Sequence, residues 1–386
     1  MSKEGEKIFF ELIRAAVWQH DAEIDSVVIT ELWHEVIQAL KDHSMLGLVA
    51  DAIMSLPMQK RPPETECCEI RRYVGTLVQE HYRQDTVIAQ LFNLFSANSI
   101  DAILMKGQGI AALYPIANTR SIGDIDIFVG MEHFTDAMRV ASDYCGVTDI
   151  MAVPTADNIH GSMKVMRPSW LKGVELEIHY KAADTAIQSI KEVYNRCAAE
   201  KMHTGPFRIV NIGDAEVRTP GSAWGVVYVF EHLLKHLRYE GVGYRQFVDW
   251  MLCLNALNGE YDELGELLRR FRLMNAWQVL GGVLVWQLGY DAAKFPFWNE
   301  RKALHSQGRN LKYITDSANL GSGTAQAKGY YYMRPSLLRK LKAVKYYARY
   351  ILFEFQLFPH DTIGRLSHRL FATVWGMFTR SSKYHN

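Results

Sequence analysis

Two acidic residues alternate with two isoleucines at Asp124-Ile125-Asp126-Ile127, in a chain whose apolar residues mostly recur at helical spacing. Side chains alternate between the faces of a β-strand, so a strand here presents both carboxylates on one face and both isoleucines on the other. Two neighbouring carboxylates repel, and each resists ionisation beside the other. A divalent cation relieves this repulsion, and oxygen ligands suit Mg²⁺ or Mn²⁺. The alternative is an exposed strand end where both acids only meet water.

The apolar pattern changes along the 386 residues and divides the chain into four regions. Residues 1–98 are predicted to be helical, with a long helix over about 64–98. Residues 99–219 alternate short strands and helices, which predicts a mixed α/β core ending in a small hairpin. Helical spacing resumes over 220–320. Residues 321–386 combine a small-residue linker with basic amphipathic helices.

Composition excludes several classes of protein. The net charge is +1, so no affinity for nucleic acid or membrane follows from the whole chain. The five cysteines are odd in number, two are adjacent at Cys67-Cys68, and no C-x-x-C occurs, which argues against a disulfide framework or a zinc finger and favours a reducing cytoplasm. We expect no signal peptide, because the N-terminus lacks an apolar core and cleavage site, and no transmembrane helix.

A second acidic strand is predicted in "GVELEIHY", residues 173–180. Glu175, Glu177 and His179 share one of its faces by the same alternation. If this strand lies beside the first, one of its glutamates completes a three-carboxylate site, of the kind that holds two metals in phosphoryl or nucleotidyl transfer. The alternative is a half-exposed strand whose polar face meets water.

A lysine and a glycine end the strand that precedes the acidic pair. The sequence "LMKGQGIAALYP" predicts a strand, a glycine turn at Gly107 and a short helix. Such a turn offers backbone N–H groups to an anion, and Lys106 and Arg120 add positive charge for phosphates. The G-x-x-x-x-G-K-[ST] motif is absent. The alternative is that the glycines only shape a turn.

Together these segments resemble the uncharacterised nucleotidyltransferase family, a branch of the DNA-polymerase-β-like superfamily. The resemblance is carried by "LMKG", "LYP", Arg120, "GDIDIFV" and "ELEIHY", and it extends over roughly 99–255. It implies an α+β fold, in which a small mixed β-sheet with flanking helices lies between N-terminal and C-terminal helical regions.

The resemblance also implies the roles of the acidic residues. Asp124 and Asp126 are implied to bind two Mg²⁺ or Mn²⁺ ions. A third carboxylate is implied to bind the catalytic metal and to help activate the acceptor hydroxyl. Glu177 is favoured over Glu175 for this role, because an acid followed by an apolar residue and histidine is typical of the family, as in Glu177-Ile178-His179.

The nucleotide-binding residues implied by the resemblance are Lys106, Gly107, Gln108 and Arg120. One departure concerns the first turn, where the superfamily usually has Gly-Ser and this chain has Gly107-Gln108. The separation between this turn and Asp124 is also longer than usual.

The implied reaction moves a nucleoside monophosphate from an NTP to an acceptor hydroxyl and releases pyrophosphate. The acceptor can be a small molecule, a sugar phosphate, a protein or an RNA end. A non-catalytic module that binds a nucleotide or a partner on the same fold is the main alternative. A phosphohydrolase that uses the same metals is a third hypothesis.

Two further groups on predicted helices carry weaker signals. His232 and His236 are four residues apart and share one helix face, which allows metal binding, a role facing substrate, or ordinary helix histidines. A zinc protease is improbable because the glutamate of H-E-x-x-H is missing. Arg245 and Asp249 have the same spacing and are predicted to form an ion pair.

The C-terminal segment 334–386 is strongly basic, with ten lysines and arginines against two acids, Glu354 and Asp361. Its apolar residues follow helical spacing. A basic amphipathic helix can lie peripherally on an anionic membrane, hold a nucleic-acid backbone or pack on its own protein, and all three alternatives stay open.

Overall fold

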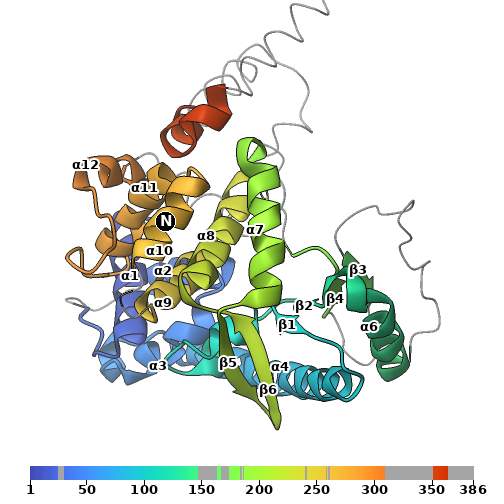
Figure 1. Ribbon diagram of the computed structural model, residues 1–386. Helices are drawn as coiled ribbons and strands as arrows, with labels where there is room; N and C mark the ends of the chain where they lie inside the picture. Colours follow the sequence, from blue (N-terminus) through green and yellow to red (C-terminus); the bar gives the residue numbers. More distant parts are fainter. Residues whose placement is uncertain are drawn as a thin grey trace, which may run out of the picture.

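The structure is a computed structural model that describes residues 1–24, 30–146, 163–166, 174–182, 185, 187–239, 241–257, 259, 261–308 and 351–363. A large helical body carries a small β-sheet on one side, and a β-hairpin projects beneath it (Figure 1). Within its four regions the sequence also predicts a strand at 149–153 and a small-residue linker at 319–329, and both segments lie outside the described residues. No helix within these described ranges is long and apolar enough to cross a membrane.

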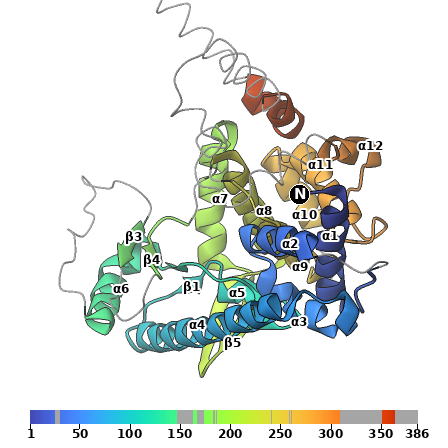
Figure 2. The ribbon, with the colours of Figure 1, turned by 180° about the vertical axis from the view of Figure 1, so that it is seen from behind.

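The N-terminal region is helical, as predicted, and no strand lies in its described residues. Its helices are α1 (Lys3–Trp18), α2 (Thr30–Asp42), α3 (Leu46–Ser55), the short η1 (Met58–Lys60) and α4 (Glu64–Ala97). The predicted long helix is confirmed as α4, which begins directly after two prolines. Proline fits a helix start because it cannot donate the backbone hydrogen bond that an interior position requires. Figure 2 shows α4 running from beside α3 to the sheet.

Within the described residues, the core sheet has four strands in the order β1-β2-β4-β3. These are β1 (Ile103–Leu104), β2 (Ile125–Phe128), β3 (Met163–Met166) and β4 (Leu176–His179). Strands β2 and β4 are parallel, whereas β1 and β3 run antiparallel to their neighbours. The sheet is therefore mixed, and the predicted α+β fold is confirmed.

The sheet buries one face of β2 and β4 against helices. Ile125 and Ile127 are at most 1% exposed, and Leu176 and Ile178 are fully buried beside them. The helix α6 (Gly130–Cys145) follows β2 and ends at Gly146, whose φ of 66° is the left-handed conformation that glycine adopts without strain. The apolar residues of both acidic strands thus face the core, which leaves the acids for the opposite face.

Short elements connect the sheet to its surroundings. They are α5 (Gln108–Ala111), η2 (Ala117–Thr119), η3 (Gln188–Ile190), α7 (Lys191–Thr204), β5 (Phe207–Ile212) and β6 (Ala215–Pro220). The predicted hairpin is confirmed as the antiparallel pair β5–β6. It packs against α4 and β1.

The helices after the hairpin share one hydrophobic core with the N-terminal helices. They are α8 (Ser222–Tyr239), α9 (Tyr244–Asn255), α10 (Tyr261–Arg270), α11 (Met274–Trp286), α12 (Glu300–Ala303) and η4 (Leu304–Ser306). Phe9, Trp33, Trp224 and Trp250 are fully buried in this core. The indole N–H of Trp18 also donates to the Leu288 carbonyl over 2.7 Å. The N-terminal helices and the helices after the hairpin therefore pack around α8 and α9 in the same core.

Part of the basic C-terminal segment packs on the protein itself. Residues 351–357 and 359–363 are helical, and the acids Glu354 and Asp361 of this segment are both buried against Arg238 of α8. The Arg238 Nε donates to Glu354 over 2.9 Å, and its guanidinium lies 4.8 Å from the Phe358 ring centre. Packing on the protein therefore holds for this part, while 334–350 and 364–386 lie outside the described residues.

We expect Gly47→Ala to destabilise the fold by about 1–3 kcal/mol, because an added methyl group overpacks the site. A Cβ atom at Gly47 would lie 2.5 Å from the Thr119 carbonyl oxygen and 2.5 Å from Leu77 Cδ2. The matched control is Gly75→Ala in α4, where no atom lies within 4 Å and alanine favours the helix by about 1 kcal/mol. Urea unfolding measures both, and equal stability of the two variants would contradict the prediction.

Candidate active site

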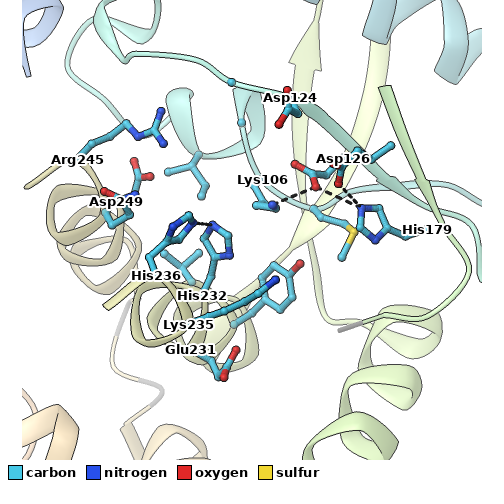
Figure 3. Close-up of a pocket in the computed structure, with 18 of the residues that line it drawn as sticks. Lys106, Asp124, Asp126, His179, Glu231, His232, Lys235, His236, Arg245 and Asp249 are labelled. Carbon is cyan, nitrogen blue, oxygen red and sulfur yellow. Dashed lines mark hydrogen bonds and ion pairs between the residues drawn. The ribbon is translucent and has the colours of Figure 1, made fainter. Parts of the chain in front are cut away.

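A cavity of about 390 Å³ lies between the sheet and the helices α8 and α9. One wall comes from the end of β1 and from β2 and β4, and the other comes from α8 and α9 (Figure 3). The volume falls in the usual range for small-molecule sites. Most residues singled out in the sequence line this one space.

The acids of the two strands meet because the strands pair in a defined register. Asp126 of β2 is opposite Glu177 of the parallel strand β4. Asp126 is 5% exposed, and its Oδ1 lies 3.0 Å from Lys106 Nζ and 3.2 Å from His179 Nε2. The same His179 nitrogen lies 3.2 Å from Glu177 Oε2. Lys106 thus forms an ion pair with Asp126, and His179 contacts both carboxylates.

Electrostatics at this cluster favour an ionised Asp126. Burial alone raises the pKa of Asp126, but the Lys106 ammonium and the His179 ring outweigh it and hold that pKa well below its usual range. Burial lowers the pKa of His179, but the hydrogen bonds to Asp126 and Glu177 raise it above the ordinary value. The pocket therefore keeps a negative carboxylate in a nearly dry position.

Asp124 lies at the start of β2 and is more exposed than Asp126. Its Oδ1 accepts a hydrogen bond from the backbone N–H of Glu175 over 3.3 Å. Burial raises its pKa, and the hydrogen bond from Glu175 opposes this, while the negative charge of Asp126 adds to it. This is the mutual resistance to ionisation that the alternating sequence implies, and an added cation would relieve it.

Two groups of potential metal ligands overlap at Glu177. Asp126, Glu177 and His179 form one, and Asp124, Glu175 and Glu177 form the other, with the ligand atoms of each within 4.8 Å of one another. Glu177 lines the cavity and Glu175 does not. Asp124 and Asp126 belong to different groups. Glu177 belongs to both, so it connects the three predicted carboxylates. The contacts of His179 with both acids were not anticipated, although the Glu-x-Glu-x-His alternation places it on the same face.

The predicted nucleotide-binding residues separate into two sets. Lys106 and Gly107 line the cavity, and Gly107 has a φ of 64° that favours glycine. Gln108 instead is buried outside the cavity lining, where its Nε2 donates to Gln84 Oε1 over 2.5 Å. The residue that replaces the usual serine of this turn is therefore used to anchor α5 against α4.

Arg120 lines the cavity but is fixed by a buried ion pair. Its Nε and Nη2 donate to the two carboxylate oxygens of Asp249 over 2.8 and 2.7 Å, and Tyr114 donates to the same carboxylate over 2.7 Å. The prediction of an ion pair between Arg245 and Asp249 is wrong, because Asp249 pairs with Arg120. Arg245 donates to the Ser121 carbonyl over 2.9 Å instead.

The wall formed by α8 and α9 carries polar residues to which the sequence alone gave no definite role. His232 and His236 both line the cavity, with their Nε2 atoms 3.0 Å apart, and Lys235 and Arg245 line it beside them. The side chains of both histidines face the same space as the carboxylates (Figure 3). The sequence shows that the two histidines are four residues apart, but it does not show which segment they face.

Comparisons with known proteins identify the family of the chain. The model of a family described as uncharacterised nucleotidyltransferase matches residues 30–285. A search of solved structures finds similarity to an antigenic nucleotidyltransferase-like protein from Paracoccidioides brasiliensis, with 17% sequence identity, coverage of 50% of this chain and 90% of that chain, and a TM-score of 0.29. No curated protein matches the sequence. Because the family model spans well over half of the chain, the protein belongs to the uncharacterised nucleotidyltransferase family.

Proposed function

We propose that the protein transfers a nucleoside monophosphate from an NTP to an acceptor hydroxyl and releases pyrophosphate. The observation that carries the proposal is the register pair of Asp126 and Glu177, which joins the acids of two strands beside Lys106 in one cavity. Membership of a nucleotidyltransferase family supports the reaction class. The acceptor is one of the classes named above: a small molecule, a sugar phosphate, a protein or an RNA end.

The donor set fits a hard divalent cation. Four carboxylates and one imidazole make up the two overlapping groups, and carboxylate oxygens are the ligands that Mg²⁺ and Mn²⁺ prefer. We assign Asp124, Asp126 and Glu177 as the residues that would hold these ions. When bound, the ions neutralise phosphate charge and orient the attacking and leaving oxygens.

The side chains of the chain itself have separate tasks in this reaction. The acceptor oxygen forms a bond to the α-phosphorus, the bond to the β-phosphate oxygen breaks, and pyrophosphate leaves with the electron pair. Glu177, whose side chain is 14% exposed against 5% for Asp126, is the carboxylate assigned to take the hydroxyl proton. His179 positions it through their 3.2 Å contact, and Lys106, which lines the cavity, is the residue assigned to bind a phosphate oxygen.

Two labels on the nucleotide test the proposal. The protein is incubated with Mg²⁺ or Mn²⁺ and a mixture of hydroxyl acceptors, and each NTP carries the label on its α- or γ-phosphate. Transfer predicts α-label on an acceptor and γ-label in pyrophosphate, both lost in Asp126→Asn. Release of γ-label as inorganic phosphate without any acceptor would favour the phosphohydrolase instead.

A non-catalytic nucleotide-binding module is the second candidate. The observation that favours it is the turn at Gly107-Gln108, because Gln108 bonds to Gln84 rather than facing the cavity. NTP binding without turnover of either label, in the presence of every acceptor class, would support this candidate over the transferase.

We expect Lys106→Met to raise the affinity for Mn²⁺ by about tenfold in the absence of nucleotide. The Lys106 ammonium lies 3.0 Å from Asp126 and competes with a cation for this carboxylate, and a charged hydrogen bond contributes about 1.5–3 kcal/mol. Affinity for NTP is expected to fall in the same variant. Lys181→Met is the control, because Lys181 lines the cavity but lies over the Tyr180 ring. Titration calorimetry measures both, and unchanged Mn²⁺ affinity in Lys106→Met would contradict the competition.

A further inference from the structure

Basic and imidazole side chains gather on the wall opposite the carboxylates, where the two acids that also line the cavity are bonded to other residues, Glu231 to Thr185 and Asp249 to Arg120. Lys235 and His236 of α8 and Arg245 of α9 line the cavity there, together with His232 (Figure 3). We call these four residues the α8–α9 wall. They face the acidic end of the same cavity. The acidic end suits cations, and the α8–α9 wall suits anions.

The hydrogen bond that Arg245 donates goes to a neutral backbone group, and its charge is only partly balanced by its neighbours. Its Nη1 donates to the Ser121 carbonyl, its buried Nε has no hydrogen-bond partner, and no carboxylate of the described residues forms an ion pair with it. Arg120 differs, since both oxygens of Asp249 neutralise it. Burial and the positive charge of Arg120 lower the pKa of Arg245, and the negative charge of Asp249 opposes them without restoring the ordinary value. An anion in the cavity would supply further counter-charge.

The two histidines suit an anion better than a metal. Their Nε2 atoms are 3.0 Å apart, so one ring donates its N–H to the other. Burial, Lys106 and His236 hold the pKa of His232 well below its usual value, so this ring is neutral at pH 7. Among the described residues, no group of three potential metal ligands includes either histidine. Neighbouring lysines and Arg245 would moreover repel a cation.

We propose that the α8–α9 wall is a subsite for a phosphate group of a substrate, separate from the acidic end of the cavity. Phosphate oxygens accept hydrogen bonds from a guanidinium, an exposed ammonium and imidazole N–H groups. The proposal rests on the proposed function for the source of that phosphate. The source is either the terminal phosphates of the NTP or a phosphate carried by the acceptor.

Inorganic phosphate in EDTA is the direct probe of this subsite. Without metal, the carboxylates of the acidic end repel phosphate and Lys106 is paired with Asp126, so saturable binding that depends on Lys235 and Arg245 reports the α8–α9 wall. Titration calorimetry is expected to show binding that weakens about tenfold in Arg245→Gln and in Lys235→Gln, with partial recovery in Arg245→Lys. Lys7→Gln removes an exposed lysine of α1 outside the cavity and is expected to bind like the unchanged protein.

Two results would overturn the proposal. One is the absence of saturable phosphate binding by the unchanged protein, and the other is unchanged binding in Lys235→Gln and in folded Arg245→Gln. Lys235 is exposed on α8, so its replacement keeps the test informative even if Arg245→Gln unfolds. Circular dichroism of each variant establishes that it is folded before binding is compared.

The source of the phosphate is distinguished by adding a non-hydrolysable NTP with Mg²⁺. If the nucleotide displaces inorganic phosphate, the wall binds the terminal phosphates of the NTP. If phosphate and nucleotide bind together, the wall recognises a phosphorylated acceptor. Phosphate binding without metal-dependent nucleotide binding would leave the subsite standing and reject the proposed function. The reverse result would reject the subsite alone.

Discussion

Asp126→Asn is expected to abolish the rise in melting temperature that Mg²⁺ and an NTP together produce, and to reduce transfer activity at least about 100-fold. A ligand at 100 times its dissociation constant stabilises the native state by about 2.7 kcal/mol, so the lost shift is measurable. Asp126 is 5% exposed between Lys106 and His179. An amide keeps its shape but removes the charge that a divalent cation requires.

The acids around Asp126 provide graded controls for this experiment. Asp143→Asn replaces an exposed acid of α6 outside the cavity and is expected to keep the full shift. Glu177→Gln is expected to lose more than Glu175→Gln, because Glu177 lines the cavity and belongs to both ligand groups. A full metal- and nucleotide-dependent shift in Asp126→Asn would remove Asp126 from the site. A larger loss in Glu175→Gln would exchange the roles of the two glutamates.

The features predicted correctly depend on short-range pattern. Alternation over four residues predicts which side of β2 is buried, and Ile125 and Ile127 are indeed in the core. The same alternation places Glu177 and His179 on one face of β4. What it does not determine is the partner strand or its register, since a shift by one residue would turn Glu177 away from Asp126. Here the chemistry of the two acidic segments pointed to their proximity.

The incorrect and missing predictions depend on contacts that are distant in sequence. The i, i+4 spacing favoured Arg245 as the partner of Asp249, but Arg120, which is 129 residues away, pairs with it. A planar guanidinium bonds both carboxylate oxygens at once, and burial of both groups favours this bidentate geometry over a helix-surface pair. The sequence also could not predict which residues the α8–α9 wall faces. Only the fold shows that α8 and α9 line the same cavity as the acidic strands.

Asp249→Ala is expected to lower the free energy of unfolding by about 3–5 kcal/mol, the largest loss of stability that we predict for a single substitution. Asp249 and Arg120 are each 5% exposed, and Tyr114 donates to the same carboxylate. Removing the acid leaves a buried guanidinium and a buried hydroxyl without their acceptor. Urea unfolding followed by circular dichroism measures the loss.

An exposed ion pair separates the effect of burial from that of charge. Asp101 and Arg218 form a 2.6 Å pair whose acid is 76% exposed, so Asp101→Ala is expected to cost at most about 1 kcal/mol. Replacing both partners of the buried pair, Arg120→Met with Asp249→Leu, is expected to recover much of the stability, because no buried charge is then left uncompensated. Equal losses in Asp249→Ala and Asp101→Ala would show that the buried pair contributes no more than a surface one. Since Arg120 lines the cavity, the recovered double variant also shows whether NTP binding needs its charge in addition to the fold that it supports.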